Sequence, residues 1–328
     1  MKISVAMASF NGEKYIEEQF LSIRNQTILP HEVVVSDDAS EDGTCKVINS
    51  LKRSMPFEIK LIKNEARVGY CRNFNIALNA ISGDLIFLSD QDDYWLPHKI
   101  ESILNEAKSN DCLMYFHDAY IVNSILTHSG LTVFQQLFSA GISLEEFQIG
   151  SCSAVKRDLL DMCLPIPDKY PAHDGWLATW SGGMGKKHFI AEPLQLYRRH
   201  NENTSQFIGA RLSRINKISL FYEALKKIIY QDCCYSERDL EGLKMVQEHA
   251  VNIGNKKNLK SDQAKDIQML LNFINKKVFY LEKRLDIRSM RFPLRTYSAS
   301  KLLMTKEFGS SYGIINAARD ILFAKNKK

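Results

Sequence analysis

The chain has 328 residues, which is enough for one large domain or two. Hydrophobic residues make up 45% of it and charged residues 25%, values that argue against a disordered, collagen-like or coiled-coil protein. The net charge of +5 is too small to indicate a nucleic-acid-binding protein by itself. However, residues 276–328 carry a local charge of +9, so the preceding residues carry −4. The charge pattern therefore indicates an acidic body followed by a basic tail.

Cysteine usage and hydropathy favour a soluble, cytoplasmic protein. The seven cysteines are an odd number and include no C-x-x-C pair, which disfavours a disulfide framework or a zinc site. No apolar run approaches the roughly 18 residues of a membrane span. The apolar run at the N-terminus is short, and polar residues follow it at once, so we interpret it as a strand and not as a signal peptide.

The first hundred residues alternate between strand and helix patterns. Short, nearly continuous apolar runs predict buried strands, and apolar residues at helical spacing predict the helices between them. Asn11, in the turn after the first run, is of a type that can cap a helix. The alternation predicts an α/β domain with a mostly parallel sheet that helices cover on both faces. The expected strands are 3–8, 32–36, 57–62 and 84–89, and the expected helices are 16–25, 43–51 and 69–80.

The second half of the chain is less regular at first and then helical. A strand-like run at 113–116 precedes a long stretch that contains Gly and Ser. Long helical patterns follow between about 211 and 285, for example 220–230 and 267–285. We expect one domain at 1–208 and a helical C-terminal segment with the basic tail at 209–328.

Polar side chains follow three of the expected strands, at Ser9 to Asn11, at Asp37 and Asp38, and in the acidic run 89–93. In an open parallel sheet, ligands bind beyond the carboxyl ends of the strands. Two acidic clusters there repel each other unless a cation lies between them, and a divalent cation is held by one or two carboxylates together with phosphate oxygens. The alternative is that the first pair caps a helix and the second run is a solvated turn. The presence of both clusters on strand ends of one sheet favours the cation site.

Six segments carry ordered motifs, at 3–11, 32–44, 64–73 with Arg67, 83–93, 173–176, and 196–200 with Asn203. As an ordered set, these motifs resemble the family 2 glycosyltransferases with the GT-A fold. The resemblance runs from residue 2 to about 205, and implies a nucleotide-sugar half at about 1–100 and an acceptor half at about 101–208. The segment around 89–95 and the helical extension also resemble bacterial rhamnosyltransferase-like members that build surface polysaccharides.

The resemblance implies a pyrimidine nucleotide as part of the donor. Asp38 would accept a hydrogen bond from the imide N–H of uracil or thymine, which suits a carboxylate because it is an acceptor only. Phe10 would pack near the base, and Arg67 would help to hold the nucleotide. The implied nucleotide-binding residues are Ala8, Phe10, Asp37, Asp38, Arg67 and Asp90.

The resemblance also implies a divalent cation, Mn²⁺ or Mg²⁺. Asp92 would be the principal ligand, with Asp90 beside it, and Asp93 is the runner-up because spacing alone cannot rank the three carboxylates. His200 would be a metal or phosphate ligand, although a buried structural histidine is the alternative. Arg198 would neutralise charge beside the diphosphate.

Asp174 is implied as the general base that takes the proton of the acceptor hydroxyl. Its apolar neighbours Trp176 and Leu177 are expected to desolvate it and raise its pKa. His173 stands where the family often has Glu, so the resemblance assigns that position no role.

These inferences together predict an inverting, metal-dependent glycosyltransferase. It would move a sugar from a UDP- or dTDP-sugar to a saccharide hydroxyl during synthesis of a bacterial surface polysaccharide, without a protein nucleophile. The acceptor is expected to be lipid-linked, with the basic tail in peripheral contact with an anionic membrane. The alternative for the tail is an ordinary helix that packs on the protein.

Two other function classes are disfavoured. A sugar-nucleotide nucleotidyltransferase would normally carry a Gly-rich basic loop after the first strand, and this chain has none there. A nucleic-acid-binding module is suggested only by the basic tail, because the sequence has no helix-turn-helix, zinc or stacking-aromatic motif.

Overall fold

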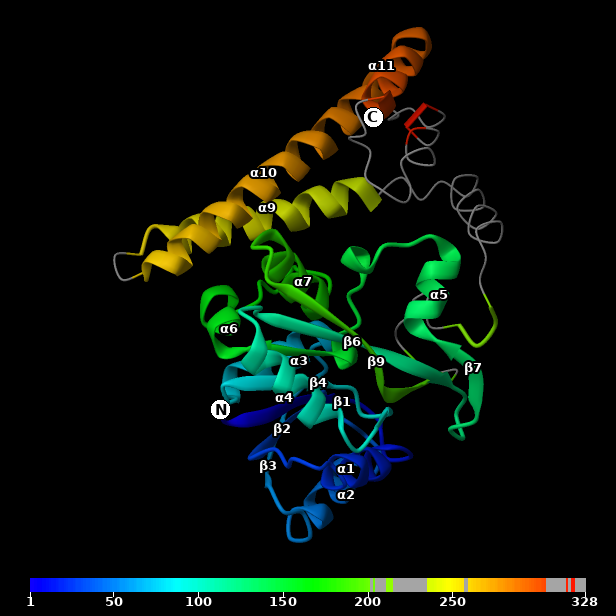
Figure 1. Ribbon diagram of the computed structural model, residues 1–328, viewed down its shortest axis with the longest axis vertical. Helices are drawn as coiled ribbons and strands as arrows, with labels where there is room; N and C mark the ends of the chain where they lie inside the picture. Colours follow the sequence, from blue (N-terminus) through cyan, green and yellow to red (C-terminus); the bar gives the residue numbers. More distant parts are fainter. Residues whose placement is uncertain are drawn as a thin grey trace. The chain divides into compact units, whose positions relative to one another are not determined.

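The structure of the protein is a computed structural model (Figure 1). It describes residues 1–200, 203, 211–214, 235–256, 259–304, 317, 320 and 321. It forms two compact units, of which unit 1 is Met1–Gln136 with Phe147–Arg214, and unit 2 is Leu137–Glu146 with Ile215–Lys328. The expected boundary after residue 208 and the expected helix 220–230 lie outside the described residues.

Within its described residues, unit 1 is built on a nine-stranded sheet in the order β3-β2-β1-β4-β8-β6-β9-β5, with β7 paired to β6. Strands β3, β2, β1 and β4 are parallel, as are β6 and β9, whereas β8 runs antiparallel to β4 and β6. The mostly parallel α/β sheet predicted from the sequence is confirmed. The strands are β1 (Ile3–Ser9), β2 (Glu32–Asp37), β3 (Glu58–Lys63), β4 (Leu85–Ser89), β5 (Tyr94–Trp95), β6 (Met114–Val122), β7 (His128–Thr132), β8 (Ser153–Lys156) and β9 (Lys187–Arg198).

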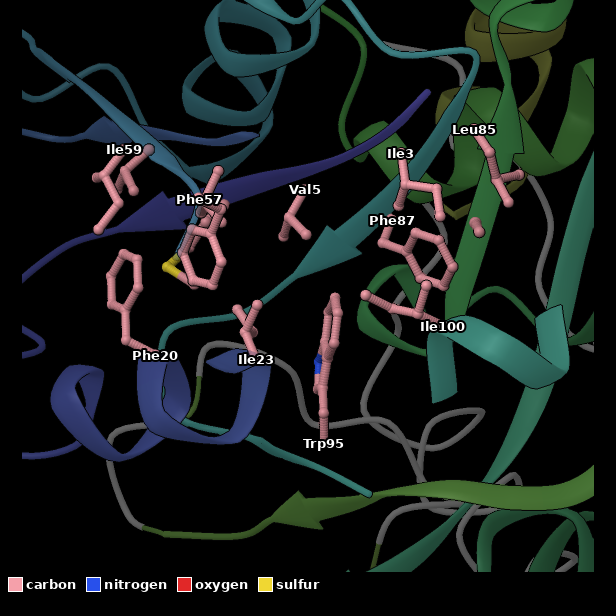
Figure 2. Close-up of a cluster of buried hydrophobic side chains, with 14 of the residues drawn as sticks. Ile3, Val5, Phe20, Ile23, Phe57, Ile59, Leu85, Phe87, Trp95 and Ile100 are labelled. Carbon is pink, nitrogen blue, oxygen red and sulfur yellow. The ribbon is translucent and has the colours of Figure 1, made fainter. Parts of the chain in front are cut away.

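Helices cover both faces of this sheet. Successive side chains of a strand point to opposite faces, yet every residue of β2 and of β4 is buried, so both faces are covered. On one face, apolar side chains of α1, α2 and α4 pack on the strands, and Figure 2 shows Phe20, Trp95 and Ile100 in this core. Helix α3 packs against β1 and β2. The helices of the first 200 residues are α1 (Ile16–Arg24), α2 (Thr44–Leu51), α3 (Tyr70–Ala80), α4 (Lys99–Ser109), α5 (Val133–Ala140), α6 (Arg157–Cys163) and α7 (His173–Gly183), with short turns η1 (Leu144–Glu146) and η2 (Gly150–Cys152).

Strand β6 is longer than the sequence pattern predicted. The expected strand ended at residue 116, whereas β6 continues to Val122. Polar His117 and Asp118 interrupt the apolar run, but both side chains are buried. A strand in the middle of a sheet can bury polar residues when they find partners, so the apolar pattern alone ended the prediction too early.

Unit 2 is helical in its described part. It contains α9 (Tyr235–Gly254), α10 (Ser261–Ser289) and α11 (Phe292–Met304). The helix expected at 267–285 is confirmed and lies within α10, which packs against α9. Asp320 is fully buried and forms ion pairs with Arg284 and Arg288 of α10. Among the described helices, none combines the length and the apolar character needed to cross a bilayer.

Candidate active site

The polar segments that follow β1, β2 and β4 lie at one edge of the sheet. In the parallel register, Ser9 of β1 is paired with Asp37 of β2, and Met7 of β1 is paired with Ser89 of β4. The three strands therefore end side by side, and the loops after them share one edge. The structure thus brings together the three segments that the sequence placed at strand ends.

Phe10, Arg67 and Asp38 form a cluster at this edge. The Arg67 guanidinium lies 3.9 Å from the centre of the Phe10 ring, and its Nε is 4.0 Å from Asp38 Oδ2. Asp38 accepts hydrogen bonds from the backbone N–H groups of Val68 (2.6 Å) and Gly69 (2.9 Å). Each carboxylate oxygen has a second lone pair, so Asp38 can still accept a hydrogen bond from a ligand.

Asp37 and Asn11 join the neighbouring loops to one another. Asp37 is buried and accepts hydrogen bonds from the Ser9 hydroxyl (2.8 Å) and from the hydroxyl (2.6 Å) and N–H (2.9 Å) of Ser40. Asn11 has a positive φ of 47°, and its side chain accepts a hydrogen bond from the N–H of Glu41 (3.0 Å). Asn11 does not cap α1, which begins only at residue 16, so that expectation was wrong. Ala8 lies one residue before the end of β1, and its contact with a nucleotide stays a prediction.

Two carboxylates of the acidic run, Asp92 and Asp93, point in different directions. Asp92 Oδ2 lies 2.8 Å from His200 Nε2 and 3.3 Å from Asn203 Nδ2. Asp93 is 1% exposed, and it accepts hydrogen bonds from Gln195 Nε2 (3.0 Å) and from the N–H of Arg198 (3.1 Å). Asp92 is therefore better placed than Asp93 to hold a cation, because both oxygens of Asp93 are bonded inside the protein.

Mutual repulsion and burial act on the ionisation of this run. Burial, together with the carboxylates of Asp93 and Asp92, raises the pKa of Asp90 well above its usual range, and the Asp174 carboxylate adds to that shift. Burial and the Asp92 carboxylate raise the pKa of Asp93 to about 7. A positive charge placed among these groups would therefore be stabilised, which suits the expected cation.

The donor set fits a divalent cation that is shared with a ligand. Among the described residues, no three His, Cys, Asp or Glu side chains form a ready metal cage. Asp92 and His200, with Asp90 nearby, supply only part of a coordination shell. Divalent cations at phosphate sites commonly take one or two carboxylates and complete the shell with substrate phosphates and water. The residues present fit that type of site.

Arg198 holds the acidic run from the side of β9. Its side chain is 3% exposed, and it donates to the carbonyl oxygens of Asp92 (2.7 Å) and Ser124 (2.7 Å) and forms an ion pair with Glu18. The guanidinium also lies 4.7 Å from the centre of the Tyr15 ring. Most of its donors are therefore used within the protein, and the expected contact with a diphosphate stays a prediction.

Asp174 is the second residue of α7 and is half-buried. Its Oδ1 accepts a hydrogen bond from the N–H of Gly175 (2.8 Å). Trp176 is fully buried, and its Nε1 donates to the carbonyl of Cys163 (2.8 Å), so this indole is bonded to α6. The role of Asp174 as a base stays a prediction that this geometry allows.

His173 is packed tightly beside Asp174. Its ring stacks on Phe74 with centroids 3.8 Å apart, and within the described part of the chain neither ring nitrogen has a hydrogen-bond partner. Burial lowers the pKa of His173, so the neutral ring is favoured. A Cβ on Gly150 would lie 2.8 Å from His173 Nε2 and 3.3 Å from the Cβ of Asp174. Gly150, His173 and Phe74 therefore fix the start of α7.

Three residues of the site had no assigned role in the sequence analysis. The side-chain amide of Gln91 pairs with both the N–H and the carbonyl of Phe10, each at 2.9 Å. Lys99 and Gln195 are fully buried beneath the acidic run. Lysine and glutamine usually lie at the surface, so composition and spacing gave no signal for these two positions.

Comparisons with known proteins match part of the chain to a family and to several relatives. Residues 4–163 match the family model described as Glycosyl transferase family 2. An uncharacterized glycosyltransferase of Nostoc sp. is 29% identical over 62% of this chain and 66% of its own length, just under two thirds. The dTDP-rhamnosyl transferase RfbG of Shigella flexneri is 26% identical over 63% of this chain and 75% of its own length.

A relative named for its substrates and a solved structure add to these matches. The UDP-Glc:alpha-D-GlcNAc-diphosphoundecaprenol beta-1,3-glucosyltransferase WfgD of Escherichia coli is 32% identical over 52% of this chain and 64% of its own length. The structure of S. aureus TarS 1-349 in complex with UDP superimposes with a TM-score of 0.57 at 16% identity, and covers 98% of this chain and 89% of that one. At this identity the superposition is evidence for the fold alone.

Proposed function

Because the chain belongs to glycosyltransferase family 2 and has the GT-A fold, we propose that it is an inverting, metal-dependent enzyme that transfers a sugar from a UDP- or dTDP-sugar to a saccharide hydroxyl. One observation carries this proposal. The Phe10–Arg67–Asp38 cluster and the acidic run lie at the same sheet edge, and Asp174 is close enough to the run to raise the pKa of Asp90.

The cluster at the edge supports a pyrimidine donor. Phe10 offers an aromatic face, and Asp38 has lone pairs free for an imide N–H, which uracil and thymine carry. The names of the relatives agree with this choice, since one includes dTDP and another UDP-Glc. The Arg67 side chain, which is 68% exposed, can move off Phe10 to make room for a base or to contact a phosphate.

Asp92 and His200 would hold the cation, Mn²⁺ or Mg²⁺, and Asp90 would lie beside it. When bound, the cation would offset the charge that builds up on the diphosphate as the sugar leaves. Asp174 would accept the proton of the attacking hydroxyl through Oδ2, which has no hydrogen-bond partner among the described residues, whereas Oδ1 is bonded to a backbone N–H. A single base and direct displacement give inversion at the anomeric carbon.

The acceptor is proposed to be a lipid-linked saccharide in the synthesis of a surface polysaccharide. WfgD, at 32% identity, is named for a diphosphoundecaprenol acceptor. A lipid-linked acceptor would place the enzyme at the inner face of the cytoplasmic membrane.

The basic tail supplies side chains that suit contact with anionic lipid. On α11, Phe292, Leu294 and Tyr297 are more than 60% exposed, and Arg291 beside them is exposed as well. Leu302 is instead buried in a small core, so only some of the tail's apolar side chains are exposed. Each basic residue near an anionic surface contributes about 1 kcal/mol. The triple variant Phe292→Ser, Leu294→Ser and Tyr297→Ser should co-sediment less with anionic vesicles than the wild type does. Equal sedimentation would show that these side chains do not contact the membrane.

The proposed function is tested by incubating the purified protein with UDP-, dTDP- and GDP-sugars and Mn²⁺ or Mg²⁺, and by measuring release of the nucleoside diphosphate. Hydrolysis or transfer confined to UDP- or dTDP-sugars, and lost on chelation of the metal, is expected. Equal turnover of GDP-sugars would contradict the nucleobase assignment, and full turnover in EDTA would contradict the metal.

A further inference from the structure

Lys99 is a fully buried lysine beneath the acidic run. It begins α4, and its Nζ donates hydrogen bonds to the carbonyl of Ser151 (2.8 Å) and to Gln195 Oε1 (2.6 Å). The same nitrogen lies 4.1 Å from the centre of the Trp95 ring, which stands in the core shown in Figure 2. Burying an amine costs free energy unless it is hydrogen-bonded, so these hydrogen bonds are needed to keep Lys99 at this depth.

A path of hydrogen bonds leads from Lys99 through Gln195 toward the acidic run. Its side chain is fully buried, with Oε1 accepting from Lys99 and Nε2 donating to Asp93 Oδ2 (3.0 Å). The reversed amide would place its NH₂ group against an amine and its oxygen against a carboxylate. Lys99 therefore fixes the amide in the orientation that bonds Asp93. A protonated or a neutral amine can donate these hydrogen bonds.

Asp93 and Arg198 carry the path to the backbone of Asp92. The second oxygen of Asp93 accepts from the N–H of Arg198 (3.1 Å), and Arg198 Nε donates to the carbonyl of Asp92 (2.7 Å). Strands β5 and β9 run along the path, with Trp95 paired to Gln195 in the sheet. The path thus runs from a buried amine to the residue proposed to hold the cation, through groups that are each buried and bonded.

We propose that Lys99 is a positioning residue that fixes Asp92 for the divalent cation through Gln195 and Asp93. Lys99 does not touch the cation or the donor in this scheme. Its hydrogen bonds hold the acidic run from inside, so that the Asp92 carboxylate keeps its direction toward His200. The inference rests on the proposed metal dependence.

The test measures metal binding without catalysis. Lys99→Met and Gln195→Met each keep an unbranched side chain but remove hydrogen bonds of the path. Lys108→Met, in the same helix but exposed, is the matched control. Binding of Mn²⁺ in the presence of UDP is followed by the electron paramagnetic resonance signal of the free ion. Loss of a group that orients a metal ligand typically costs about 10–100-fold in metal affinity. We expect Lys99→Met and Gln195→Met to weaken Mn²⁺ binding at least about tenfold, and the control to bind as the wild type does.

The double variant tests whether the two residues act along one path. If they do, Lys99→Met with Gln195→Met should bind Mn²⁺ about as weakly as the worse single variant, because neighbours in one network are not additive. Folded single variants that bind Mn²⁺ like the wild type, or strictly additive losses, would overturn the inference. If Lys99→Met does not fold, Gln195→Met alone decides in the same way. A wild-type protein that binds no Mn²⁺ would overturn the metal dependence of the proposed function itself.

Discussion

Replacing Gly150 by alanine is expected to displace Asp174 without touching the Phe10–Arg67–Asp38 cluster. The new methyl group would lie 2.8 Å from His173 Nε2 and 3.3 Å from the Asp174 Cβ. His173 cannot retreat, because its ring is already stacked on Phe74 at 3.8 Å. The strain must therefore move the first turn of α7, which carries Asp174.

Two magnitudes follow from this geometry. Forcing an extra methyl group into a packed core usually costs about 1–3 kcal/mol of stability. A displacement of about 1 Å in a catalytic group can cost about 100-fold in rate. A shift of a few tenths of an ångström up to 1 Å should therefore lower kcat by roughly 10–100-fold, while UDP or dTDP affinity stays within about twofold.

The assay compares kcat of sugar transfer, nucleotide affinity and melting temperature. Gly182→Ala, in the same helix α7, is the control, since its Cβ would meet only the flexible end of Lys187. Adding His173→Ala to Gly150→Ala removes the obstructing ring and should recover part of the lost rate. Wild-type kcat in Gly150→Ala, or no recovery in the double variant, would refute the reasoning.

Four further substitutions test the proposed roles. Asp174→Asn should lower transfer by about 10²–10⁴-fold, as loss of a general base does, while metal-dependent UDP binding stays near wild type; a retained rate would move the base elsewhere. Asp92→Ala should abolish metal-dependent turnover in a folded protein, whereas Asp93→Ala should keep a metal-dependent rate with weaker metal affinity, because it removes the acceptor of the hydrogen bonds from Gln195 and Arg198 but leaves the Asp92 carboxylate in place; the reverse pattern would exchange their roles. Asp38→Asn should weaken UDP or dTDP binding by about 1–3 kcal/mol in calorimetry, and unchanged affinity would contradict a contact with the base.

The strands and helices of the first hundred residues could be predicted from sequence because their signals are local. Runs such as 32–36 are β-branched and apolar, and the observed β2 matches that run within one residue. Since parallel strands end at one edge, the same patterns also placed Asp38 and the acidic run together. The strand order and strand β5, in which Tyr94 pairs with Leu196 of β9, involve partners far apart in the chain, so the sequence pattern did not define them.

The directions of the site's side chains were decided only by the tertiary structure. Spacing alone could not rank Asp92 and Asp93, because adjacent residues share the same local pattern. Their difference arises from Gln195 and His200, which lie more than 100 residues away in sequence and bond Asp93 and Asp92 respectively. From its sequence context, Lys99 likewise resembles an ordinary surface lysine. In the structure it is fully buried and donates a hydrogen bond to Gln195 of β9. The sequence determined where the acidic groups lie along the chain, whereas long-range packing determined which of them points toward His200 and which one is bonded inside the fold.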